Sequence, residues 1–154
     1  MGQAEAEQEL TPLRHNQIGQ TISGWLKLIP CIYNNLYKRK CCSILRDRHE
    51  AKARHAWAEG RWDVRLMEAV CKGIRDYYFW PRWSLFLPQD DCYVLLELWR
   101  LQIADGLELV GLILDIEREF SCSLPGEMIE RFPRMTLGEW IAQMQPLIQP
   151  EAAR

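Results

Sequence analysis

The chain lacks the residue patterns of most enzymes and metal sites. Its six cysteines show no Cys-x-x-Cys spacing, and His49 and His55 do not have the i, i+4 spacing of a helical metal pair. The sequence contains neither a glycine-rich phosphate loop nor a nucleophile paired with a base. We therefore predict no catalytic residues, no metal site and no cofactor, and a protein that is not an enzyme.

Long apolar runs are missing as well. The apolar segment from Ile18 to Leu36 is interrupted by Pro30 and is too polar for a membrane span, which needs about 20 mostly apolar residues. It also lacks the basic start and the cleavage site of a secretory signal. Without such a signal the cysteines are typical of reduced thiols, and the sequence predicts a cytoplasmic protein.

Strand patterns are rare, because polar and apolar residues do not alternate over any long stretch. Hydrophobic residues make up 48% of the 154 residues, which is enough for a packed core. We predict an all-α fold in three parts. These are a disordered tail over residues 1–17, a helical and basic extension over residues 18–60, and a helical bundle over residues 61–149.

The clearest helix follows Asp105. Asp105 and Glu108 match a capping box, in which two side chains accept from backbone N–H groups of the first turn. Apolar residues at helical spacing then predict a buried face formed by Leu109, Leu112, Ile113, Ile116 and Phe120. A second apolar strip lies beside that face and consists of Leu107, Val110 and Leu114. This strip either packs beneath the preceding loop or meets a protein partner.

Further helices are predicted on both sides. One runs from about Trp62 to Tyr78, and the long segment 81–104 contains apolar residues that indicate another helical piece, placed as a lid on the bundle. Trp80 and Trp83 are the tryptophans that we expect to be partly exposed.

The C-terminal segments carry strong helix boundaries. A short helix is predicted from Pro125 to Phe132, and Pro133 ends it by disfavouring helical geometry in the preceding residue. Thr136 and Glu139 form a second capping box, which opens the last helix. That helix should turn Leu137, Trp140, Ile141 and Met144 inward.

The triplet Asp105-Gly106-Leu107, with this order of helices, resembles the centre of acyl carrier proteins of a divergent bacterial type. In that family an Asp-Ser-Leu triplet opens the second helix, and its serine carries phosphopantetheine. Gly106 has no hydroxyl. The resemblance therefore implies an acyl-carrier-like four-helix bundle, with a helical N-terminal extension, that cannot be loaded at this position. The alternative is a genuine carrier modified at another hydroxyl, such as Ser121 or Ser123.

Charge is unevenly distributed, although the net charge is only −2. Residues 36–83 carry 12 Lys or Arg and 6 Asp or Glu, whereas residues 84–130 carry 2 and 10, so the two regions have charges of +6 and −8. Carriers dock to basic enzyme surfaces through an acidic second helix. The resemblance thus implies a protein partner with a basic surface, from acyl-transfer machinery. The residues expected to contact it are Asp105, Leu107, Glu108, Val110, Leu114 and Asp115.

Other roles are weighed beside this one. No nucleic-acid motif accompanies the basic region, so we expect no nucleic-acid partner. A further alternative is that the basic region folds back on the acidic region of the same chain. The segment 18–36 lies beside Lys38-Arg39-Lys40, and it either packs on the bundle or lies on an anionic membrane surface. A purely structural helical protein would share the fold without the docking.

Overall fold

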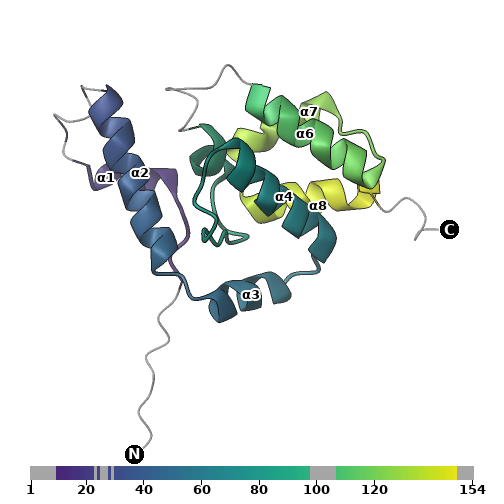
Figure 1. Ribbon diagram of the computed structural model, residues 1–154, viewed down its shortest axis with the longest axis horizontal. Helices are drawn as coiled ribbons and strands as arrows, with labels where there is room; N and C mark the ends of the chain where they lie inside the picture. Colours follow the sequence, from purple (N-terminus) through teal and green to yellow (C-terminus); the bar gives the residue numbers. More distant parts are fainter. Residues whose placement is uncertain (1–9, 23, 25–27, 29, 98–106, 149–154) are drawn as a thin grey trace, which may run out of the picture.

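The structure is a computed structural model that describes residues 10–22, 24, 28, 30–97 and 107–148. Over these residues the chain is all-α, as predicted, apart from one isolated antiparallel bridge between Asp91 and Thr136. Its helices are α1 (His15–Gln20), α2 (Pro30–Arg46), α3 (Glu50–Ala58), α4 (Val64–Tyr77), the π-helix η2 (Tyr93–Glu97), α6 (Leu107–Phe120), α7 (Gly126–Arg131), the 3-10 helix η3 (Phe132–Arg134) and α8 (Leu137–Ile148). In Figure 1, α1 and α2 stand on one side, α4, α6, α7 and α8 on the other, and α3 lies beneath them.

Helix α4 packs along α6, and its buried residues are Leu66, Val70, Cys71 and Ile74. Its true N-cap is Asp63, whose carboxylate accepts a hydrogen bond from the backbone N–H of Leu66 at 3.0 Å. The predicted start at Trp62 was therefore two residues early. Glycine allows the close approach, because a Cβ atom on Gly73 would lie 2.3 Å from the Leu112 side chain.

The segment that follows α4 runs through the interior, where a lid was predicted. Its middle is buried, and it includes η2, the helical piece that the sequence predicted between residues 81 and 104. Trp80 is also buried, and its indole N–H donates to the backbone carbonyl of Leu95 at 2.9 Å. The prediction of partial exposure was wrong for Trp80 and is confirmed for Trp83. Trp80 is buried because its one polar atom finds a partner inside.

The C-terminal helices begin and end close to their predicted bounds. Pro125 is the residue before α7, and Pro133 ends that α-helix through the single tight turn η3. The core-facing residues of α8 are those that the spacing predicted: Leu137, Trp140, Ile141 and Met144.

The capping box at the start of α8 is confirmed. The Thr136 backbone N–H donates to the Glu139 carboxylate at 2.8 Å, and the Glu139 N–H donates to the Thr136 hydroxyl at 3.3 Å. These hydrogen bonds lower the pKa of the Glu139 carboxyl group. A lowered pKa means that the capping contribution is present at neutral pH and is lost as the pH falls through the folded-state pKa.

We expect Thr136→Ala to reduce the free energy of unfolding by about 1 kcal/mol, because the orphan N–H groups of α8 lose their acceptor. Urea unfolding followed by circular dichroism measures this loss. An unchanged midpoint would show that the α8 cap does not contribute to stability.

The N-terminal part differs most from the prediction. Residues 10–17 belong to the fold and not to a disordered tail, since Leu13 is fully buried and α1 begins at His15. Pro30 begins α2 where an interruption was expected, because a proline fits the first helical position. The sequence analysis placed a break at Pro30, and a helix boundary does lie there. The proline begins a helix, however, and does not interrupt one. No helix within the described ranges is long and apolar enough to cross a bilayer.

A buried ion pair joins the N-terminal part to the rest. Arg48 and Asp90 have side-chain exposures of 1% and 0%, and the guanidinium binds both carboxylate oxygens, at 2.6 and 2.7 Å. Asp90 also accepts from the backbone N–H of Leu13 at 2.7 Å and of Leu87 at 2.8 Å. The Asp90 carboxylate thereby connects its own segment with Leu13 and Arg48, which are distant in sequence. A contact between the basic and acidic regions was one of the predicted options, and Arg48–Asp90 is such a contact.

The neighbouring Asp91 extends this connection. Its side chain accepts from the Arg14 guanidinium at 2.8 Å and from the His15 N–H at 3.0 Å. Its backbone N–H donates to the Leu13 carbonyl at 2.9 Å. The start of α8 is attached here too, because the Leu137 N–H donates to the Asp90 carbonyl. We call Asp90, Asp91 and Arg48 the aspartate clamp.

Candidate functional site

The predicted docking strip lies on the exposed side of α6. Leu107, Val110 and Leu114 are 66%, 51% and 50% exposed, whereas the opposite face of the helix is buried through Leu112, Ile113 and Ile116. The segment 81–97 is packed into the core and does not cover this strip. Contiguous exposed apolar patches are typical of interaction surfaces, whereas single exposed apolar residues are common. We call Leu107, Val110 and Leu114 the α6 strip.

Acidic side chains flank the α6 strip. Asp115 accepts from the Tyr77 hydroxyl at 2.6 Å and from the Arg118 guanidinium at 3.3 Å. The hydrogen bond to Asp115 raises the pKa of Tyr77. Tyr77 lies against Gly111, where a Cβ atom would come within 2.5 Å of its ring. Glycine at this position therefore lets Tyr77 reach across from α4 and orient the Asp115 carboxylate.

A shallow groove of about 280 Å³ runs between α4 and α6, beside the strip. It is lined by charged groups of both signs: Lys72, Asp76, Asp115, Arg118 and Glu119. Of the six residues predicted to contact a partner, the structure places Leu107, Glu108, Val110, Leu114 and Asp115 on α6. Asp105 and Gly106 lie outside the described residues.

Ser121 and Ser123, the two alternative hydroxyls, follow the C-terminal end of α6. Ser121 directly follows the helix, with a positive φ of 50°, and Ser123 is exposed. At 1.5 Å per residue, α6 places them about 20 Å from its own first turn.

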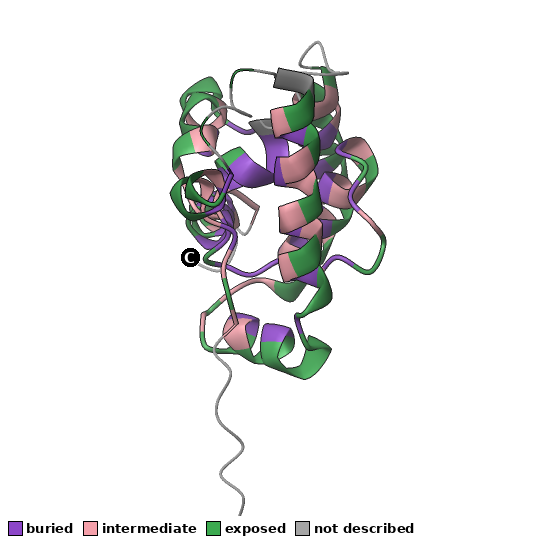
Figure 2. Cartoon of the chain, turned by 90° about the vertical axis from the view of Figure 1, so that its left-hand side faces the viewer, coloured by how far each residue is buried: buried purple, intermediate pink, exposed green. Residues whose placement is uncertain are grey.

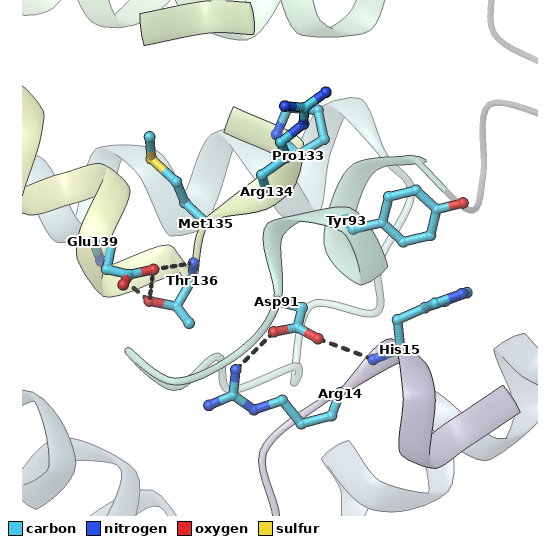
Figure 3. Close-up of a pocket in the computed structure, with 9 residues that line it drawn as sticks. All are labelled: Arg14, His15, Asp91, Tyr93, Pro133, Arg134, Met135, Thr136 and Glu139. Atoms are coloured by element: carbon cyan, nitrogen blue, oxygen red, sulfur yellow. Dashed lines mark hydrogen bonds and ion pairs between the residues drawn. The ribbon is translucent and has the colours of Figure 1, made fainter. Parts of the chain in front are cut away.

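A second pocket, of about 520 Å³, lies beside the aspartate clamp (Figure 3). Arg14 and His15 from the N-terminal segment face Tyr93, Arg134 and Glu139 across it. Most of its polar groups serve the fold: Arg14 and the His15 backbone bind Asp91, and the His15 ring nitrogen Nδ1 lies 3.0 Å from the Tyr37 hydroxyl. Sequence reasoning missed this pocket because it had placed residues 14 and 15 in a disordered tail.

Three of the described cysteines, Cys41, Cys71 and Cys92, are buried in the core. Burial raises the pKa of the Cys41 and Cys71 thiols to about 12, and it raises that of Cys92 as well. Thiols of this kind react slowly at neutral pH. Among the described residues, no three His, Cys, Asp or Glu side chains are grouped so that they could hold a metal ion.

Comparisons with family models, with curated proteins and with solved structures give no significant match.

Proposed function

We propose that this chain is a non-catalytic, acyl-carrier-like protein that lacks the phosphopantetheine serine and acts by non-covalent docking through α6. The observation that carries the proposal is the exposed α6 strip with its acidic neighbours. Gly106 adds the second argument, since it stands where the family resemblance expects the acceptor serine.

The chemistry of α6 defines its partner. Four acidic residues and a single basic one lie on the helix, and the apolar strip runs along its exposed side. A matching surface offers apolar side chains in the centre and Lys or Arg at the rim, where charges steer the encounter and fix the orientation. Enzymes of acyl transfer that bind carriers through such surfaces are the partner class that we propose.

Val110→Asp tests the docking surface. A carboxylate in the centre of a packed apolar contact would be desolvated without a partner, so we expect binding to weaken by about 30-fold, the equivalent of about 2 kcal/mol at a hot-spot residue. Affinity is measured by isothermal titration against a purified phosphopantetheinyl transferase and a purified carrier-dependent acyltransferase.

Val64→Asp is the matched control. It makes the same chemical change at a residue of similar exposure, 59%, but on the first turn of α4. Both variants should melt close to the wild type, because a substitution of an exposed residue costs little stability. Equal affinity of the two variants, or no binding by the wild type to either enzyme, would contradict the proposal. A gain of one phosphopantetheine in intact mass after incubation with the transferase and coenzyme A would favour a genuine carrier instead.

A further inference from the structure

We propose that α2 of a second copy of this chain provides a basic surface for the α6 strip. This inference rests on the proposed function, because it names one partner for the same face. It follows from the unequal charge of two helices that are exposed on different sides of one molecule.

Helix α2 carries four basic residues and no acidic one. Its exposed residues recur at spacings of three and four and therefore share one side of the helix: Ile32, Asn35, Arg39, Ser43 and Arg46. Ile32, which is 40% exposed, lies nearest the start of α2, and the exposed cations Arg39 and Arg46 lie further along the helix. The side of the molecule that carries α2 faces the viewer in Figure 2, where exposed and half-buried residues are visible along this helix. We call this row the α2 row.

The order of side chains on the two helices is the same, with opposite charge. The α6 strip comes early in its helix, and the acidic residues Asp115, Glu117 and Glu119 come late. In α2, Ile32 comes early and Arg39 comes about 10 Å further along, at 1.5 Å per residue. After Leu114 the same side of α6 continues with Glu117 and Arg118, whereas Asp115 and Glu119 lie toward α4. A parallel alignment of the two helices therefore sets Ile32 against the α6 strip and brings Arg39 close to Glu117.

The two surfaces do not satisfy each other within one copy. Figure 1 shows α2 and α6 on different sides, with α4 between them. Asp115 is paired with Arg118 of its own helix, and the contact that joins the basic and acidic regions inside the protein is Arg48–Asp90, away from both surfaces. With a net charge of only −2, two copies repel each other weakly, while α2, with four basic residues and no acidic one, attracts α6, with four acidic residues and one basic one.

In such a contact different surfaces of the two copies meet. The interface is heterologous if it repeats into a chain or ring, and isologous if two such contacts close reciprocally in a pair. In each case, one variant that disables α2 and another that disables α6 can still bind each other through their intact surfaces. This complementation distinguishes the α2–α6 contact from a contact of like surfaces.

The experiment is sedimentation velocity of the full chain over a wide range of concentration, at low and high salt. The wild type should associate at low salt, and Arg39→Glu and Val110→Asp should each be monomeric alone. An equimolar mixture of these two variants should form a dimer. Arg61→Glu, which reverses an exposed charge between α3 and α4, is the control and should associate as the wild type does.

A monomeric wild type at every concentration and salt would overturn the inference, and so would a mixture of the two variants that stays monomeric. If the wild type stays monomeric but sediments with phosphatidylserine vesicles, the α2 row is a membrane surface and the inference is wrong. None of these results alters the titration against carrier-binding enzymes, so the proposed docking of α6 to such enzymes is tested independently.

Discussion

Asp90→Ala is expected to lower the free energy of unfolding by about 3–5 kcal/mol, because it leaves the Arg48 guanidinium buried without its counter-charge. The Leu13 and Leu87 N–H groups lose their acceptor at the same time. Urea unfolding followed by tryptophan fluorescence measures the loss. If the variant is already unfolded in buffer at 25 °C, the loss of stability lies at the upper end of this range.

The double variant Arg48→Met/Asp90→Ala separates the charge from the packing. Removing both charges eliminates the unpaired ion, and we expect much of the lost stability to return. Asp91→Ala is the neighbouring control and should cost less, because the Asp91 and Arg14 side chains are partly exposed. The importance of the buried pair would be refuted if Asp90→Ala unfolded at the same urea concentration as the wild type.

Deleting residues 1–16 is expected to destabilise the protein by about 4 kcal/mol or more. The deletion removes Leu13, and truncation of a buried leucine alone costs about 2–5 kcal/mol. It also removes the backbone N–H groups of Leu13 and His15, which donate hydrogen bonds to Asp90 and Asp91. Thermal melting and urea unfolding measure the effect.

Deletion of residues 1–9 is the control for a shortened chain, because it keeps the hydrogen bonds of Leu13, Arg14 and His15 to Asp90 and Asp91. The two deletions should differ clearly in stability. Equal stability would support the disordered tail that the sequence predicted through residue 17, and would contradict the buried position of Leu13.

Local signals explain why the C-terminal helices were predictable. Thr136 and Glu139 lie three residues apart, and their capping box depends on nothing outside that turn. The apolar spacing of α6 likewise defines its buried face. Asp63 is an equally local N-cap, and α4 begins directly after it, two residues later than the predicted start at Trp62.

The aspartate clamp could not be predicted in this way. Arg48 and Asp90 are 42 residues apart, and Leu13 and Asp90 are 77 apart. Residues 10–17 contain two leucines, Leu10 and Leu13, among mostly polar residues. Two residues are too few to establish a periodicity, so nothing in this segment distinguishes a buried strap from a tail. The candidate site was predictable only in part. Helical spacing identified the α6 strip, but spacing alone could not decide whether the segment before α6 covers Leu107, Val110 and Leu114.

The sequence separation of 77 between Leu13 and Asp90 also affects how the chain folds. Contacts between distant parts of a sequence form late, because the intervening loop must first close at an entropic cost. During synthesis, Leu13 and Arg14 leave the ribosome well before Asp90 and Asp91. The N-terminal segment therefore stays unattached, with its apolar side chain in water, until the ribosome has released the aspartates.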